Sequence, residues 1–315
     1  MKEERYLAID IGGTKIAIGR FLRDGTLEEK VIFPTNAERG YKKILEEIIK
    51  NLSRLKTKDT VALGIGCGGP LDSEKGIILS PPNLPGWDSV PLKKDLESFL
   101  KIPTFLDNDA NCACLGEYYF GAGKGIKNLV YVTVSTGIGG GIIINGKILR
   151  GQRDSAGEVG HQTIVPDGPL CNCGNRGCLE ALASGTAIAK RAQEAILRGE
   201  DTILKEWSKT EKISAKMVRS AYLQGDKVSE KIWKDALEYL GIGIGNIITI
   251  ISPERVILGG GIVKAGEEVI ETVKKVVKDR VRLVPIEKVE IVPSELGEDV
   301  GLYGAFALIL SEMGV

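Results

Sequence analysis

Three cysteines and one histidine give the sharpest chemical signal in the sequence. Cys171, Cys173 and Cys178 fall within eight residues, among glycines that allow tight wrapping, and His161, the only histidine, lies ten residues before Cys171. Three thiolates and one imidazole form a closed tetrahedral zinc set without an open position. The alternative, free thiols beside a core histidine, would leave reactive groups at unusual density. We therefore predict one structural zinc ion per chain.

Glycine-rich turns form a second signal. The first, Asp10-Ile11-Gly12-Gly13-Thr14-Lys15, separates two predicted strands. Its glycines allow backbone N–H groups to approach phosphate oxygens, Thr14 adds a hydroxyl, and the Asp10 carboxylate suits Mg²⁺. Taken alone, this turn fits an ordinary hairpin equally well.

A second turn at Thr136-Gly137, running on through Gly141, also lies between predicted strands. This repetition of strand, turn and strand indicates a degenerate internal repeat of a whole lobe. Two such loops predict a polyphosphate between them, although no G-x-x-x-x-G-K-[ST] motif occurs. A third cluster, Gly259-Gly260-Gly261, follows a strand and could let adenine or ribose lie against the backbone.

Polar side chains gather where the predicted strand at 104–106 meets a helix expected from Asp109 to Phe120. Asp107 and Asn108 could cap that helix. Asp109 lies beyond a comfortable cap, and it suits a general base that accepts a hydroxyl proton during phosphoryl transfer. Two further carboxylates, Glu158 and Glu180, bracket the cysteine cluster. A zinc ion would hold them in one rigid patch able to accept hydrogen bonds from vicinal hydroxyls, whereas without zinc they would be ordinary surface charges.

The elements that must position these residues are those of a mixed α/β protein. The chain has 315 residues with 43% hydrophobic content, which favours two domains. Strands dominate the first forty residues, helices dominate 180–251, and a last helix is expected over 300–313. We predict an N-terminal lobe of residues 1–117 completed by 300–315, and a larger lobe of 118–299 that carries the zinc site and dimer-forming helices.

Charge and hydropathy narrow the class of protein. Lys and Arg together number 42, as do Asp and Glu, and this balance argues against a nucleic-acid partner. There is no run of eighteen apolar residues and no signal peptide at the N-terminus, so we expect no membrane association and a cytoplasmic location.

These motifs together resemble the ROK family of sugar kinases and repressors, and within it the bacterial glucokinases. The resemblance covers essentially the whole chain. It rests on six segments: Asp10–Lys15, Gly64–Leu71, Asn83–Trp87, Asn108–Asn111, Gly157–His161 and Cys171–Glu180.

The resemblance implies a two-lobed, actin-like (ribonuclease H-like) ATPase fold with ATP in the cleft, and an ATP-dependent hexose kinase of glycolysis. It implies Asp109 as the base and zinc bound by His161, Cys171, Cys173 and Cys178. The sugar ligands that it implies are Gly68, Gly69, Asn83, Asn108, Asp109, Glu158, His161 and Glu180. The ATP and Mg²⁺ ligands that it implies are Asp10, Gly12, Gly13, Thr14, Lys15, Thr136 and Gly137. To these we add Gly259, Gly260 and Gly261, the cluster that could lie against adenine or ribose. A homodimer, or a dimer of dimers, is expected.

Other functions remain open at this point. Glucose is favoured by Asn83–Trp87, but fructose, mannose, allose, N-acetylglucosamine and N-acetylmannosamine are alternative substrates. Polyphosphate or ADP could replace ATP as donor. A sugar-sensing repressor is the main rival, although the phosphate loop begins at Asp10 and leaves no room before it for a helix-turn-helix domain. A zinc-ribbon nucleic-acid binder would need basic residues around the cysteines, where only Arg176 occurs.

Overall fold

A computed structural model describes residues 3–314, which fold into two compact units. The first contains the chain up to Lys127, the segment Gly141–Gly157 and the residues from Glu295 onward. The second contains Asn128–Gly140 and Glu158–Ser294. Both units are therefore discontinuous in sequence. The division into lobes of 1–117 with 300–315 and 118–299 stays a prediction.

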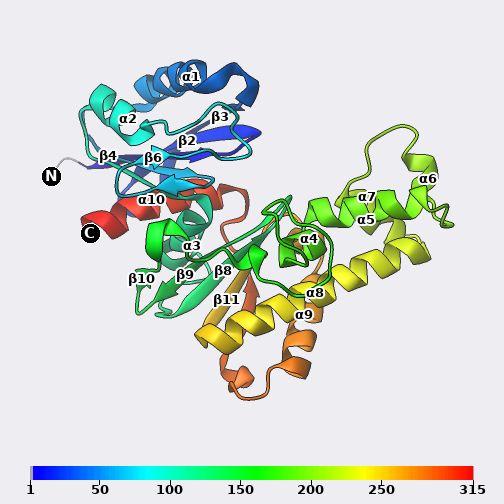
Figure 1. The fold of residues 1–315 in the computed structure, drawn as a ribbon. Helices are drawn as coiled ribbons and strands as arrows, with labels where there is room; N and C mark the ends of the chain where they lie inside the picture. The colour runs from blue at the N-terminus through cyan, green and yellow to red at the C-terminus, as the bar shows by residue number, and fades with distance from the viewer. Residues whose placement is uncertain (1–2, 315) are drawn as a thin grey trace. The chain divides into compact units, whose positions relative to one another are not determined.

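The first unit is built on a five-stranded sheet of order β3-β2-β1-β4-β7 (Figure 1). The strands β1, β2 and β3 pair antiparallel, as hairpins require, whereas β1–β4 and β4–β7 are parallel. The bounds are β1 Arg5–Ile11, β2 Lys15–Leu22, β3 Leu27–Pro34, β4 Thr60–Cys67 and β7 Thr104–Asn108, with a small ribbon of β5 Leu71–Asp72 and β6 Ile77–Ile78.

Side chains of β1 alternate between two hydrophobic clusters, as the two-residue period of a strand demands. Leu7 and Ile9 join the cluster under α1 (Gly40–Leu55) and α2 (Leu92–Leu100). Tyr6 and Ala8 join the cluster under α10 (Val300–Met313), which packs along α3 (Asp109–Phe120). The bounds predicted for the helices at 109–120 and 300–313 are confirmed.

In the second unit, β11 (Arg255–Gly259) pairs in parallel with both β8 (Leu129–Val134) and β12 (Glu290–Pro293). The strand β9 (Ile138–Ile144) begins in this unit and ends in the first, where it pairs with β10 (Lys147–Ile148). The second large sheet has the order β10-β9-β8-β11-β12, which repeats the connectivity of the first. The predicted internal repeat is therefore confirmed at the level of strand order.

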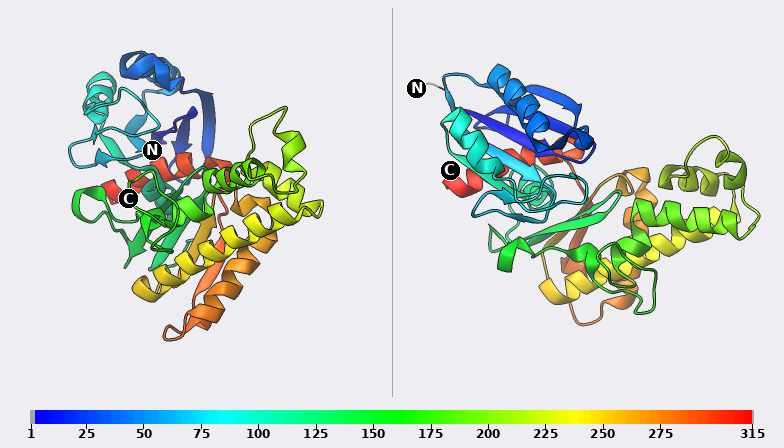
Figure 2. Two further views of the ribbon diagram at one scale, coloured as in Figure 1. Left: turned by 45° about the vertical axis from the view of Figure 1, so that its right-hand side comes forward. Right: turned by 45° about the horizontal axis from the view of Figure 1, so that its top comes forward.

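Helices make up most of the rest of the second unit. Figure 2 shows the two long helices α8 and α9 side by side in both views, and they pack together. The segment Gly241-Ile242-Gly243-Ile244-Gly245 lies inside α8. The α-helices are α4 Leu179–Ala183, α5 Gly185–Leu197, α6 Leu204–Trp207, α7 Ala215–Leu223, α8 Lys227–Ile251 and α9 Glu267–Arg280.

Short 3₁₀ turns complete both units. They are η1 Ala37–Arg39, η2 Gln152–Asp154, η3 Val159–His161, η4 Val263–Ala265, η5 Ile286–Lys288 and η6 Gly297–Asp299. Within residues 3–314, no helix combines the length and the apolar character that crossing a membrane requires.

Candidate functional site

The first glycine-rich turn joins β1 to β2 and is closed by a hydrogen bond from Gly12 N to Lys15 O of 3.0 Å. Thr35 supports it from below, donating its hydroxyl to Gly12 O at 2.6 Å. A Cβ added to Gly13 would lie 2.8 Å from the Cβ of Asn83, so only glycine fits there. The turn predicted to bind phosphate and the predicted sugar ligand Asn83 are therefore in contact.

Asn83 itself is exposed, on a loop that two buried apolar side chains anchor. Leu84 and Trp87 belong to the core cluster beneath α1 and α2, and backbone bonds from Leu84 N to Pro81 O and from Trp87 N to Leu84 O shape the loop. Leu84 and Trp87 are therefore buried, whereas Asn83 between them and the glycine-rich turn stays exposed.

Asp10 is the penultimate residue of β1, at the same edge of the sheet. It lies against the backbone of Gly301 at the start of α10, where a side-chain Cβ would collide with its carboxyl group. Burial, and next the charge of Asp109, raise the pKa of Asp10 to about 6, while Lys15 opposes the shift. Two carboxyl groups so placed attract a cation, and Mg²⁺ takes carboxylate and water oxygens. The residues present therefore fit a magnesium ion at Asp10.

The proposed base follows β7 at the first residue of α3. Asn108 is the N-cap of that helix and accepts a hydrogen bond from Ala110 N at 2.8 Å. Asp109 Oδ1 accepts from the same N–H at 2.8 Å, and its other oxygen, Oδ2, would lie 3.8 Å from a Cβ on Gly68. Asn108 thus has the capping role considered from the sequence, and this role leaves its amide nitrogen free to face elsewhere.

Neighbouring strand ends explain why these residues meet. In the parallel β4–β7 pair, Cys67 lies opposite Asn108, so the turn after β4 reaches the start of α3. A Cβ on Gly69 would lie 3.3 Å from the Asn108 amide nitrogen, and the Gly69–Pro70 peptide is cis. The Gly68-Gly69 turn therefore borders the same small space as Asn108 and Asp109.

The second unit holds the four predicted metal ligands together. The ligand atoms of His161, Cys171, Cys173 and Cys178 all lie within 4.8 Å of one another. The Sγ atoms of Cys173 and Cys178 are 3.7 Å apart, and Cys171 Sγ lies 3.6 Å from His161 Nδ1. Tetrahedral coordination with Zn–S near 2.3 Å and Zn–N near 2.0–2.1 Å requires about 3.8 Å between sulfurs and about 3.6 Å between sulfur and nitrogen. The donor set and its spacing therefore fit zinc.

The orientation of His161 separates its two nitrogens. Nδ1 faces the thiols, while Nε2 lies 3.8 Å from the carboxylate of Glu158, whose side chain is 58% exposed. Glu180 follows Cys178 directly onto α4, and its Oε2 accepts from Ile138 N at 2.9 Å. One cluster thus positions the imidazole and Glu180, and brings Glu158 beside the imidazole.

The second glycine-rich turn lies beside the N-terminus of α5. Gly185 N donates to Ser135 O at 2.7 Å, and Ser135 N donates to Gly137 O at 2.9 Å. A Cβ on Gly137 would lie 2.5 Å from Glu180 Oε2. The turn predicted to bind phosphate and the carboxylate predicted to bind sugar are therefore adjacent, as Asn83 and Gly13 are in the first unit.

A cavity of about 1020 Å³ opens beside this turn. Gly261 lines it, but Gly259 and Gly260 do not: a Cβ on either would collide with Tyr131 or with the backbone of Val134. Most of the residues that line this cavity were not predicted from the sequence. Lysines and arginines on the polar faces of helices show no distinctive spacing. The lining residues that were not predicted include Thr186, Lys190, Gln193, Lys212, Lys216, Arg219, Trp233 and Lys264.

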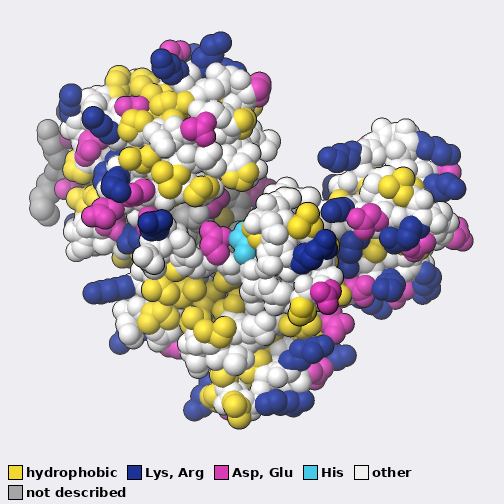
Figure 3. Space-filling model, in the orientation of Figure 1, with side chains coloured by type: hydrophobic (Ala, Val, Ile, Leu, Met, Phe, Trp, Pro, Cys, Tyr) yellow, Lys and Arg dark blue, Asp and Glu magenta, His cyan; other side chains and the backbone are white. Residues whose placement is uncertain are grey.

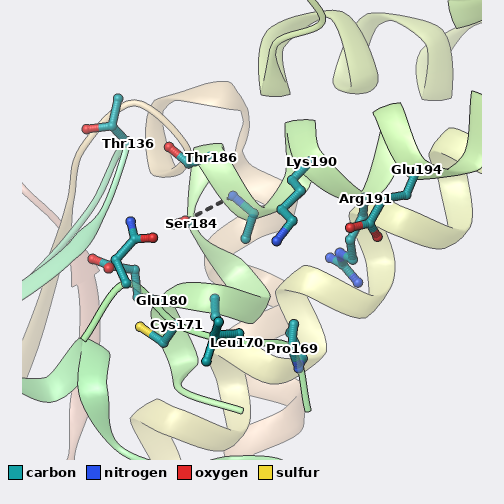
Figure 4. A pocket seen from close by; sticks show the side chains of 13 residues that line it. Thr136, Pro169, Leu170, Cys171, Glu180, Ser184, Thr186, Lys190, Arg191 and Glu194 are labelled. Carbon is teal, nitrogen blue, oxygen red and sulfur yellow. Dashed lines mark hydrogen bonds between the residues drawn. The ribbon is translucent and has the colours of Figure 1, made fainter. Parts of the chain in front are cut away.

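Lysine and arginine side chains are frequent over α5, α6 and α7, interspersed with acidic ones, on the face in Figure 3. A smaller cavity of about 110 Å³ lies beneath the cysteine loop and shares Thr136, Thr186 and Lys190 with the larger one. Figure 4 shows Glu180 and Cys171 on one side of this smaller cavity and Lys190 on the other. Positive charge thus lies near the second glycine-rich turn.

Comparison with known proteins gives a consistent result. The model of the ROK family matches residues 6–312. A glucokinase from Thermotoga maritima is 36% identical over 316 residues, covering 100% of both chains. A xylose repressor from Caldicellulosiruptor bescii is 32% identical, over 86% of this chain and 67% of the repressor.

Solved structures agree. The ROK hexokinase from Thermus thermophilus has a TM-score of 0.86 at 35% identity, covering 99% of this chain and 100% of that one. A ROK family glucokinase from Streptomyces griseus, solved in complex with glucose and AMPPNP, has a TM-score of 0.81 at 32% identity, covering 98% and 100%. The predicted fold class, the actin-like ATPase fold, is confirmed by these similarities.

Proposed function

The chain belongs to the ROK family, and from that premise we propose that it is an ATP-dependent glucokinase that makes glucose 6-phosphate and ADP. Two similarities support this activity: 36% identity over the full length to a glucokinase, and structural similarity to a glucokinase solved with glucose and AMPPNP. The observation that carries the proposal is the arrangement of Asp109 beside Gly68, at the edge of the sheet where Asp10 also lies.

In the proposed reaction, Asp109 acts as general base. Its Oδ2 accepts the proton of the glucose 6-hydroxyl as that oxygen attacks the terminal phosphorus of ATP, and the bond to ADP breaks. The hydrogen bond from Ala110 N to Oδ1 supports this role, because it fixes the orientation of the carboxylate. Asp10 would hold the magnesium ion, which supplies positive charge to the phosphates when bound.

The proposed glucose ligands are Asn83, Asn108, Asp109 and the Gly68-Gly69 turn, together with Glu158, His161 and Glu180. Amides and carboxylates can together satisfy the donor and acceptor capacity of several vicinal hydroxyls. The free Nε2 of His161 adds one more polar contact, since Nδ1 would be committed to zinc.

We assign a structural role to the zinc ion. His161, Cys171, Cys173 and Cys178 would hold it, which leaves no position for substrate. Its contribution would be to fix His161 and the start of α4, and through α4 the carboxylate of Glu180. This is the support that a binding group on a loop requires from its surroundings.

The proposed nucleotide ligands are Gly12, Gly13, Thr14, Lys15, Thr136, Gly137 and Gly261, which lines the large cavity. Lys190, which lines both cavities, extends this set because its ammonium group can reach phosphate oxygens. Gly259 and Gly260 are proposed to shape the backbone behind Gly261.

A coupled assay of ADP formation tests the function. Glucose should turn over with ATP and Mg²⁺, and it should exceed fructose, mannose, N-acetylglucosamine and N-acetylmannosamine in kcat/KM. Polyphosphate and ADP are run as alternative donors. Glucose binding without turnover of any hexose would favour a sugar-sensing regulator, a class represented among the relatives. The homodimer, the glycolytic role and the cytoplasmic location stay predictions.

A further inference from the structure

A buried carboxylate lies directly behind the proposed base. Asp107, at the end of β7 and two residues before Asp109, has a side chain that is 0% exposed. Its Oδ1 accepts from Asn108 N at 2.7 Å and from Asn111 Nδ2 at 2.9 Å. These bonds join the penultimate residue of β7 to Asn108 and to the first turn of α3, so the backbone between them, which carries Asp109, is held on both sides.

The positive partner of Asp107 comes from a distant part of the chain. Arg150, just after β10, donates from Nε to Asp107 Oδ2 at 2.8 Å and from Nη2 to Glu312 Oε1 of α10 at 2.5 Å. Burial raises the pKa of the Asp107 carboxyl, and the charge of Arg150 opposes that rise. Arg150 thus ties β7 to α10 through a carboxylate that water does not reach.

Close backbone packing holds Arg150 in reach. Gly141 of β9 lies against the first two turns of α3: a Cβ there would be 2.5 Å from the Cβ of Cys114 and 2.7 Å from Ala110 O. The backbone of β9 at Gly141 therefore packs directly against α3, with no room for a side chain between them. Arg150 comes two residues after the β9–β10 hairpin, so the same packing holds its guanidinium group in position beside Asp107.

We propose that Arg150 is a positioning residue for the base: by holding Asp107, it fixes the turn that directs the Asp109 carboxylate toward the acceptor hydroxyl. This inference rests on the proposed function of Asp109. A buried carboxylate that loses its cationic partner must rotate, take up a proton or admit water, and each of these disturbs the Asn108 N–H bond. Displacement of a reacting group by about 1 Å can cost about 10²-fold in rate.

The alternative is that the ion pair stabilises the first unit without affecting the base. Arg5 offers a matched control for this reading. It belongs to the same unit, its side chain is 23% exposed against 29% for Arg150, and its Nε and Nη2 both donate to Glu28 at 3.0 Å. Arg5→Met should lower the melting temperature and leave kcat unchanged.

The test measures kcat, KM for glucose, KM for MgATP and melting temperature for five proteins: wild type, Arg150→Met, Arg150→Lys, the double variant Arg150→Met with Asp107→Asn, and Arg5→Met. For Arg150→Met we expect kcat to fall about 10- to 100-fold while KM for MgATP changes less than about 2-fold. Arg150→Lys keeps the charge and should recover part of the loss. The double variant should exceed Arg150→Met, because a buried amide at position 107 needs no cation.

The possible outcomes distinguish the positioning role of Arg150 from the proposed glucokinase function. A kcat of Arg150→Met within about 2-fold of wild type, in a protein that turns over glucose, would overturn the inference and leave the proposed function intact. A double variant no faster than Arg150→Met would also overturn it, because the uncompensated carboxylate would then not be the cause. A wild type unable to phosphorylate any hexose would contradict both the inference and the proposed function.

Discussion

Burial of the Asp10 carboxyl group, together with the nearby negative charge of Asp109, raises the pKa of Asp10 to about 6. The two side chains come from different strand ends, β1 and the β7–α3 junction. The fold thus brings two carboxyl groups near each other, and a bound metal ion would reduce the repulsion between them.

Asp10→Asn should consequently stabilise the metal-free protein above pH 6. The carboxyl of Asp10 has a higher pKa in the folded state than its ordinary value of 3.8, so the folded state retains a proton that the unfolded state releases. The free energy of unfolding therefore falls by up to about 3 kcal/mol as the pH rises from about 4 to about 6. Above pH 6 this group causes no further fall. Melting curves in EDTA at pH 4.5 and 7.5 measure this effect. An equal difference in melting temperature between variant and wild type at both pH values would contradict this expectation. In a separate measurement, MgATP should stabilise only the wild type.

Asp109→Asn should lower kcat by about 10²–10⁴-fold, because an amide cannot accept the hydroxyl proton. Glucose binding should be partly retained, since Asn can still form hydrogen bonds and can accept from Ala110 N as Asp109 does. Steady-state kinetics and calorimetry with glucose measure the two effects separately. A variant with near-normal kcat would remove Asp109 from the mechanism.

Zinc should copurify at one equivalent per chain, and Cys173→Ser should lower both metal content and affinity for glucose. The loss of affinity would be indirect, because the metal fixes His161 and the helix that carries Glu180. Elemental analysis and glucose titration provide the readouts. As a control, Cys114→Ser alters a buried thiol outside the cluster and should keep full zinc content. Less than about a tenth of an equivalent in active, never-chelated protein would contradict this assignment.

Gly13→Ala should raise KM for both glucose and MgATP. The new methyl group would lie 2.8 Å from Asn83 Cβ and 3.0 Å from Asn83 O, so either the loop or the glycine-rich turn must move. Gly245→Ala, inside α8, serves as control, because its new Cβ would meet only Val281 Cγ2 at 3.4 Å. Unchanged KM values for Gly13→Ala would show that the contact between turn and loop is not needed for binding.

Sequence alone could predict the parts of the site that are local. The four metal ligands lie within eighteen residues, and the helix from Asp109 to Phe120 has a capping residue directly before it. Local spacing of this kind survives folding because neighbouring residues cannot move far apart. The glycine-rich turns belong to the same class.

What could not be predicted depends on residues far apart in the chain. The pair Asp107–Arg150 spans 43 positions and the pair Arg150–Glu312 spans 162. Neither has a sequence signature, since any of the 42 basic residues could have been the partner. Likewise, Lys190 lies on the polar face of a helix, where lysine is ordinary, and only the folded cavity distinguishes it.

The position of α10 has a consequence for synthesis of the protein. Phe306 of this last helix stacks on Phe21 and contacts Tyr6, closing the cluster on one face of the first sheet. Every strand of that sheet is made before residue 109, whereas α10, which covers this face, begins only at residue 300. At about 5–20 residues per second, the sheet waits roughly ten to forty seconds with one apolar face bare. We expect a nascent chain in that state to be prone to aggregation, and deletion of α10 to convert the newly made protein into an aggregating one.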